Sequence, residues 1–311
     1  DLIQTKGWEL AIDYRHTFKN GLHFGVTASV ADDKTEVTKW TYNTKIPSYG
    51  ATGWWDKSAY KEGMVLGDIW GLQFDRFLTE DDFNADGSLK AGLPDQTKVF
   101  PAGYQFAPGD VLYKDLDNNG EIVKQTNTND KGDLSVIGNA LPRLQFGLNL
   151  DAAWKGFDIS MFFQGVAKRK LWAAGNQVLP GFTTGEPFYK GAEDYWTPEN
   201  TDAFYPRPMD YKQSASGNYS VNDRYLLNMA YLRLKTFTVG YSLPKVWLSK
   251  FKVQGLRVYF TGENLFTIDG VKPAIDPEIG IRTASGKSDQ RNFGRSYPYQ
   301  KTVSFGIQLS L

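Results

Sequence analysis

An acidic stretch near the middle of the chain has the residue types and the spacing of a cation-binding loop. Positions 1, 3 and 5 carry oxygen-bearing side chains, position 6 is glycine and position 8 is β-branched. Calcium loops use this spacing because alternate side chains converge on one ion while the glycine allows a sharp turn. The stretch runs from Asp115 to Ile122, and its candidate metal ligands are Asp115, Asp117, Asn119 and Glu121.

The second half of this stretch departs from the calcium pattern. Position 12 is Thr126 and not the glutamate that usually binds calcium through both oxygens. Asp130 or Asp133, further along the chain, could supply the missing carboxylate. The alternative is an Asx-rich turn held by its own hydrogen bonds. No cofactor is required in either case, and a bound calcium would staple a long loop rather than catalyse a reaction.

Aromatic residues that could contact a ligand are concentrated in long segments between the expected strands. Flat rings can stack on sugar faces while nearby Asp, Asn and Arg side chains bind hydroxyl groups. The same rings could equally pack small loop cores or anchor a partner protein. The leading candidates for contact with a substrate or a protein lid are Trp54, Trp55, Trp172, Tyr195 and Trp196.

The chain has no recognisable residues for enzymatic catalysis. Its two histidines, His16 and His23, flank an expected turn, and it contains no cysteine. Serine-nucleophile, H-E-x-x-H, P-loop and G-x-G-x-x-G motifs are all missing from the sequence. Adjacent acids such as Asp81-Asp82 and Glu193-Asp194 are typical of solvated loops. The sequence therefore predicts that the protein is not an enzyme.

Composition narrows the class of protein further. Charge is balanced, with 35 Lys+Arg and 35 Asp+Glu, so no net field attracts nucleic acid. The 20 Phe, 17 Tyr, 9 Trp and 31 Gly suit strands, turns and aromatic belts at a membrane interface. No run of about 18 apolar residues occurs, which excludes a transmembrane helix but leaves a β-barrel open.

Seven segments with alternating apolar residues are the expected structural frame. In the last nine residues, 303–311, every odd position is apolar and every even one is small or polar. A soluble domain rarely ends on such an edge, whereas a closed membrane barrel leaves no edge unpaired. The segment 231–241 is less regular, with a mixed pattern. The expected strands are 8–15, 22–30, 144–154, 157–163, 231–241, 256–263 and 303–311.

The apolar faces also predict the register of two hairpins. In the first hairpin, even positions must pair with even positions, which places Phe18 opposite Leu22 across the loop 19–21. In the second, an even apolar set faces an odd one, which requires a two-residue loop at Lys155-Gly156.

The connections between these strands alternate between short and long. Long excursions occur at about 32–141, 168–228 and 267–298, and a candidate strand at 66–74 is assigned to the first of them. Short periplasmic turns and long extracellular loops are typical of outer-membrane barrels. Counting back from a periplasmic C-terminus places all three long loops outside. The polar residues expected to face the lumen are Asp13, Arg15, Gln145, Asn149, Asp151, Gln164, Arg257 and Glu263.

Several motifs, in order along nearly the whole chain, resemble one known family. They are 136–143 (VIGNALPR), 154–159 (WKGFDI), 163–165 (FQG), 194–200 (DYWTPEN), 231–235 (YLRLK), 240–244 (GYSLP), 262–266 (GENLF), 276–278 (DPE), 297–298 (YP) and 301–303 (KTV). Together they resemble the C-terminal region of SusC/RagA-type TonB-dependent outer-membrane transporters of Bacteroidetes.

That resemblance implies an all-β protein, a transmembrane antiparallel β-barrel of about 22 strands with an internal plug. Residues 1–311 would form its last seven strands, in the outer membrane of a Gram-negative bacterium. The implied function is TonB-dependent import of oligosaccharides or other oligomers beneath a SusD-like surface lipoprotein. The implied partners are the rest of the barrel, its plug, outer-membrane lipid and TonB.

The sequence departs from the family pattern in two ways. It ends on Leu311 where the family usually ends on an aromatic residue, and it contains neither the plug nor the segment that contacts TonB. Two other hypotheses remain: an outer-membrane surface or adhesive barrel that transports nothing, and a soluble β-sandwich lectin.

Overall fold

One long antiparallel sheet dominates the computed structural model. The structure describes residues 1–41, 62–124, 131–173, 175–182, 188–209, 217–249, 253–272, 275–278 and 299–311. The sheet has the order β1-β2-β7-β8-β11-β12-β14, and β13 also pairs with β11. Its strands are β1 (Leu2–Thr17), β2 (His23–Lys39), β7 (Arg143–Trp154), β8 (Phe157–Lys168), β11 (Tyr231–Ser242), β12 (Gly255–Glu263), β13 (Thr267–Asp269) and β14 (Thr302–Ser310).

The remaining elements lie in the connections. Three two-stranded ladders form between β3 (Asp68–Gly71) and β6 (Ser135–Asn139), β4 (Phe74–Phe77) and β5 (Val111–Tyr113), and β9 (Lys170–Leu171) and β10 (Leu227–Asn228). The short helices are η2 (Glu80–Asp82), η3 (Lys190–Ala192), η4 (Gly217–Tyr219) and α2 (Lys245–Leu248). Because β3 pairs with β6 and not with the long sheet, the expected strand at 66–74 is part of the first long connection.

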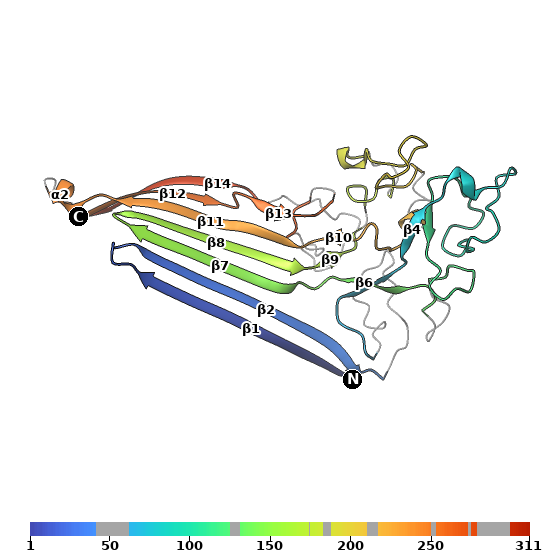
Figure 1. The fold of residues 1–311 in the computed structure, drawn as a ribbon, viewed down its shortest axis with the longest axis horizontal. Helices are drawn as coiled ribbons and strands as arrows, with labels where there is room; N and C mark the ends of the chain where they lie inside the picture. The colour runs from blue at the N-terminus through green and yellow to red at the C-terminus, as the bar shows by residue number, and fades with distance from the viewer. Residues whose placement is uncertain are drawn as a thin grey trace.

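The long sheet is a single layer with different connections at its two ends (Figure 1). The β1–β2 and β7–β8 turns, α2 and the C-terminus lie at one end, and the N-terminus and the long connections lie at the other. None of the helices in the described ranges has the length and apolarity needed to cross a membrane.

Both predicted hairpin registers are confirmed. In the first, the amide of Phe18 donates to the Leu22 carbonyl at 2.8 Å, and Gly21 has the positive φ of +81° that the three-residue loop requires. In the second, Trp154 pairs with Phe157 around a two-residue turn. Lys155 and Gly156 both have positive φ, 47° and 88°, which is the geometry of a type I′ turn.

A β-bulge explains the mixed pattern of β11. Leu234 pairs with Phe163 and Thr236 pairs with Phe162, so Lys235 is an extra residue without a partner on β8. Side chains alternate along a strand, and one extra residue therefore exchanges the parity of the two faces. Even positions share the apolar face before the bulge, and odd positions such as Phe237 share it after the bulge.

The opposite, polar face of the sheet contains an ion pair that spans three strands. Arg257 on β12 donates from Nε to Asp158 Oδ2 on β8 at 2.9 Å, and the guanidinium passes over Gly240 on β11. A Cβ at position 240 would lie 2.6 Å from both Arg257 Nε and Asp158 Oδ2. Glycine leaves room here for the two charged side chains, which would have to shift if a Cβ were present.

Gly165 on β8 provides a test of how tightly the sheet is packed. A Cβ there would lie 2.5 Å from the Tyr231 carbonyl oxygen and would also meet the Phe146 ring. Gly165→Ala is expected to lower the free energy of unfolding by about 1–3 kcal/mol, because a paired backbone carbonyl cannot move aside. Denaturant titration of the intact protein in detergent measures this change.

The matched control is Gly255→Ala, where the nearest atoms to a new Cβ belong to Ser310 at 3.6 Å. This substitution is expected to change stability by less than about 0.5 kcal/mol. Equal effects of the two substitutions would contradict the packing described at Gly165.

Candidate functional site

The described parts of the first two long connections fold together at one end of the sheet. The Leu72 amide donates to the Val221 carbonyl at 2.9 Å, which joins segments about 150 residues apart in sequence. Two apolar clusters fill the interior. The first includes Ile69, Leu171, Trp172, Leu179, Tyr205, Tyr225 and Met229, and the second includes Leu72, Phe77, Val99, Phe100, Val111, Tyr113, Ile122 and Trp196. We call this assembly the loop body.

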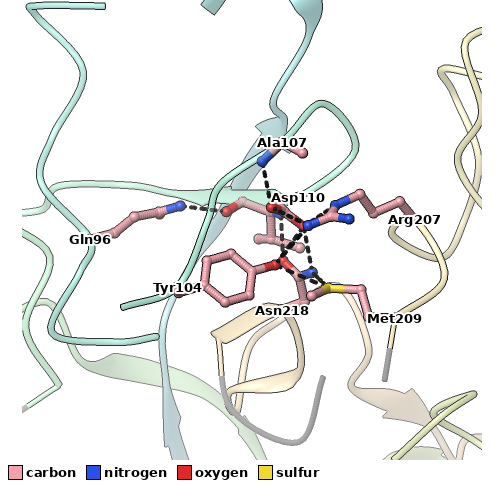
Figure 2. Close-up of polar contacts among 8 residues, drawn as sticks. Gln96, Tyr104, Ala107, Asp110, Arg207, Met209 and Asn218 are labelled. Carbon is pink, nitrogen blue, oxygen red and sulfur yellow. Dashed lines mark hydrogen bonds and ion pairs between the residues drawn. The ribbon is translucent and has the colours of Figure 1, made fainter. Parts of the chain in front are cut away.

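The carboxylate of Asp110 lies at the centre of the loop body and is fully buried (Figure 2). Its Oδ1 accepts from Tyr104 Oη at 2.9 Å, Arg207 Nε at 2.8 Å and Asn218 Nδ2 at 2.9 Å. Its Oδ2 accepts from the Ala107 amide at 2.9 Å and Arg207 Nη2 at 3.2 Å. Both oxygens are satisfied, so the charge can be buried without an unpaired acceptor.

The surroundings of Tyr104 and Arg207 favour the protonated form of both side chains. Burial, reinforced by the Asp110 charge, raises the pKa of Tyr104, so its hydroxyl remains a donor at all physiological pH values. Burial opposes the charge of Arg207, but the hydrogen bonds and the charge of Asp110 outweigh it and raise the pKa of Arg207. The network therefore joins the first and second connections rather than catalysing proton transfer.

A second buried ionic cluster holds the third connection against β11. Arg233 Nη2 donates to Asp276 Oδ1 at 2.8 Å, and Arg233 Nη1 lies 3.0 Å from Glu278 Oε1. Lys235 Nζ donates to Glu278 Oε2 at 2.7 Å. The Arg233 and Asp276 side chains are only 4% and 6% exposed, so both charges depend on each other for solvation. Tyr299 covers the cluster, with its ring 5.1 Å from the Arg233 guanidinium.

The acidic stretch brings three carboxylates together. Ligand oxygens of Asp115, Asp117 and Asp133 lie within 4.8 Å of one another, and these residues form the possible metal-binding group found among the described residues. Asp133 is fully buried and accepts from the amides of Leu116 and Val123 at 2.8 and 2.7 Å. Asp130 and Thr126 lie outside the described residues.

The structure places the other two candidate ligands differently. Glu121 forms an ion pair with Lys98, and its amide donates to Asn119 Oδ1 at 2.7 Å. Asn119 Nδ2 donates to Asp117 Oδ2 at 3.0 Å. Desolvation together with the charges of Asp133 and Asp115 raises the pKa of Asp117, whereas backbone amides lower that of Asp115. Three acids at this spacing could hold a hard cation, which would relieve their mutual repulsion.

The structure places the candidate aromatic residues in different environments. Trp172 and Trp196 are 5% and 7% exposed and belong to the two apolar clusters, and the Trp196 ring lies against Gly109. They are packing residues in this structure. Tyr195 is 41% exposed and lines a pocket with other aromatic and proline residues. Trp54 and Trp55 lie outside the described residues.

Sequence reasoning missed the Asp110 network altogether. Asp110 lies about 100 residues before Arg207 and Asn218 in the sequence, so no local spacing could indicate their contact. By contrast, Arg233, Lys235, Asp276 and Glu278 lie in the motifs YLRLK and DPE, which are visible in the sequence. The sequence did not predict that these two motifs are in contact.

The fold of the long sheet matches part of a larger β-barrel of known structure. The chain aligns with a chain in the structure of the RagAB peptide transporter with a TM-score of 0.65 at 19% identity, over 99% of this chain and 29% of that one. It also aligns with the RagAB peptide importer in the "open-open" state with a TM-score of 0.60 at 17% identity, over 99% and 29%. The expected seven-stranded antiparallel sheet is confirmed, and it matches part of the RagA barrel, although the described strands do not close on themselves.

Over about 99% of its residues, the chain is homologous to TonB-dependent receptors of the SusC/RagA type. It is 32% identical over 327 residues to TonB-dependent receptor P26 of Formosa agariphila, covering 99% of this chain and 29% of the relative. It is 26% identical over 319 residues to TonB-dependent receptor P3 of the same organism, covering 99% and 28%.

TonB-dependent receptor SusC of Bacteroides thetaiotaomicron is 25% identical over 242 residues, covering 75% of this chain and 22% of that protein. No family model matches the chain. The chain thus spans less than a third of the length of the curated relatives it matches. All three relatives are TonB-dependent receptors, in agreement with the prediction that the chain is not an enzyme.

Replacing Asp110 tests the network of Figure 2. Asp110→Asn preserves shape but removes the buried charge that pairs with half-buried Arg207, so it is expected to destabilise the loop body by about 3 kcal/mol. Hydrogen–deuterium exchange should accelerate in residues 104–113 and 217–222 and stay unchanged in the long sheet. Asp81→Asn, at an exposed carboxylate, is the matched control. Unaltered exchange in Asp110→Asn would show that the charge is dispensable.

Calcium titration tests the three-carboxylate group. Calcium is expected to bind with a dissociation constant on the order of a millimolar, the range of weak calcium-binding modules. Asp117→Asn should weaken binding, whereas Glu121→Gln should not, because Glu121 is paired with Lys98. Calorimetry of the intact protein measures both. No binding at millimolar calcium would leave the stretch as an Asx-rich turn.

Proposed function

We propose that this chain forms the C-terminal part of the barrel wall and the extracellular loops of a SusC/RagA-like, TonB-dependent nutrient importer in the outer membrane. Its single most informative feature is the apolar face of the sheet. Side chains on that face remain widely exposed at both edges of the sheet. Examples are Trp8, Leu10, Ile12 and Tyr14 on β1 at 52–56%, and Phe305 and Ile307 on β14 at 82% and 74%.

An apolar surface of this extent needs a partner other than water. In the described residues the other sheets are short ladders within the loops, so no second sheet covers the exposed face. Lipid hydrocarbon is the partner that suits alternate residues on every strand of one layer. The opposite face carries Asn149, Asp158, Arg257 and Ser304, which suit a wet lumen or a plug.

The outer edges of the sheet favour a larger barrel. Among the described strands, β1 pairs only with β2, and β14 pairs only with β12. In a bilayer the free amide and carbonyl groups of both edge strands would lack partners, at a cost of several kcal/mol each. Further strands of the same barrel would pair with them. The resemblance between this sheet and part of the RagA barrel supports this arrangement.

The loop body supports the proposal that a substrate or a lid protein binds at the end of the sheet that carries the long connections. Its buried Asp110 network gives it a fixed shape above the wall, which suits contact with a SusD-like surface lipoprotein and with imported oligomers. The RagAB relative is a peptide transporter. For this chain, oligosaccharides and peptides are both proposed cargo classes, and TonB would act through another part of the protein.

The other two hypotheses are less well supported. A soluble β-sandwich lectin would bury one sheet face against another, and the long sheet is a single layer. A surface barrel that transports nothing shares the wall, but homology to TonB-dependent receptors over about 99% of the chain favours import.

Single cysteines test which face meets the lipid, since the natural chain has none. Spin labels at Leu148→Cys and Phe305→Cys should be accessible to oxygen in the bilayer, and labels at Asn149→Cys and Ser304→Cys to an aqueous nickel complex. These paired neighbours control for local mobility because each pair lies on one strand. The reverse pattern in the intact, membrane-reconstituted protein would overturn the proposed orientation of the wall.

A further inference from the structure

An aromatic pocket lies in the loop body, and its lining residues Pro206, Pro208 and Tyr219 are chain neighbours of Arg207 and Asn218 in the Asp110 network. Its volume is about 480 Å³, within the range of small-ligand sites. The residues that line it come from the segments 180–208 and from η4. They are Pro180, Phe188, Tyr189, Lys190, Ala192, Glu193, Tyr195, Tyr205, Pro206, Pro208 and Tyr219.

The floor of this pocket is rigid. Tyr205 and Tyr219 are 3% and 4% exposed, and each ring packs on Tyr225. The Tyr205 hydroxyl donates to the Val178 carbonyl at 2.9 Å, so it is already committed to the protein. A ligand would therefore meet fixed ring surfaces rather than hydroxyl groups that can reorient toward it.

The walls and the rim offer stacking surface and few polar partners. Prolines 180, 206 and 208 have no amide hydrogen to donate. Phe188, Tyr189 and Tyr195 are 59%, 37% and 41% exposed, so their rings are available at the rim. The charged rim residues are one cation, Lys190, and one anion, Glu193.

This lining distinguishes between ligand classes. A sugar unit carries several hydroxyl groups, and each one needs a donor or acceptor when it leaves water. The described lining can supply only Lys190, Glu193 and tyrosine hydroxyl groups for this purpose, and contains no Asp, Asn, Gln or Arg. An aromatic or prolyl side chain needs only apolar contact, and the opposite charges at the rim can meet the ammonium and carboxylate ends of a short peptide.

We propose that this pocket is a peptide subsite, which takes an aromatic or prolyl residue of a short peptide against Tyr205 and Tyr219, with Phe188 and Tyr189 closing over it. The inference rests on the proposed import function and narrows its cargo at this site to peptides. Pro206 lines the pocket and would influence peptide binding through the shape of the pocket.

The test is binding by the intact, detergent-solubilised protein. The probes are the peptides Gly-Phe-Pro-Gly and Gly-Ala-Ala-Gly and the sugar maltotetraose. Binding of each probe is measured by calorimetry and by saturation-transfer NMR. Gly-Phe-Pro-Gly should bind, with its ring protons receiving the saturation. The other two probes should bind at least about tenfold more weakly, as expected when an anchor residue is lost.

Variants connect this binding to the pocket. Phe188→Ala and Tyr189→Ala should each weaken peptide binding about tenfold, whereas Phe188→Tyr should retain it. Val136→Ala removes an exposed apolar side chain outside the pocket lining and should change nothing. An unchanged circular dichroism melt for each variant shows that the loop body is intact.

The proposal is overturned if the three probes bind equally, if maltotetraose displaces the peptide, or if Phe188→Ala binds like the natural protein. None of these results depends on a bilayer or on energised uptake. A protein that shows the expected lipid-facing labels but no peptide binding would therefore reject the subsite and leave the proposed function standing.

Discussion

The structure depends on one constraint, that a single-layer sheet must separate two different surroundings with alternate side chains. Each residue added to a strand changes the face of every residue beyond it. The hairpin turns keep this alternation aligned across the strands, with Phe18 opposite Leu22 and Trp154 opposite Phe157. The continuous apolar face follows from that alignment.

The bulge at Lys235 shows how the constraint is adapted at the long-loop end. By exchanging the two faces of β11, it places Arg233 among Thr267, Asp276 and Glu278. A regular strand would have put Arg233 on the same face as Phe237, which is apolar. The bulge thus converts the last part of a wall strand into an anchor for the third connection, as bulges often do next to functional regions.

The loop body is stabilised by a combination of apolar clusters and buried charge. Residues 62–124 contain little regular structure of their own, and their ladders are three to five residues long. Asp110 accepts hydrogen bonds from both connections. If either connection were absent, buried polar groups of the other would lose their hydrogen-bond partners. This mutual dependence accounts for a defined shape in segments that have few backbone ladders, and a defined shape is what a rigid aromatic pocket requires.

The sequence alone determined the approximate positions of the seven long strands, the lengths of two turns and the register of two hairpins, because period-two alternation and turn residues such as Gly21 and Gly156 are local signals. Motif resemblance indicated the class of protein. Only the tertiary structure decided that Trp172 and Trp196 are buried, that Asp133 joins Asp115, and that Asp110 meets Arg207. Those contacts join segments far apart in sequence, and their energy comes from burial and charge pairing, which no local pattern encodes.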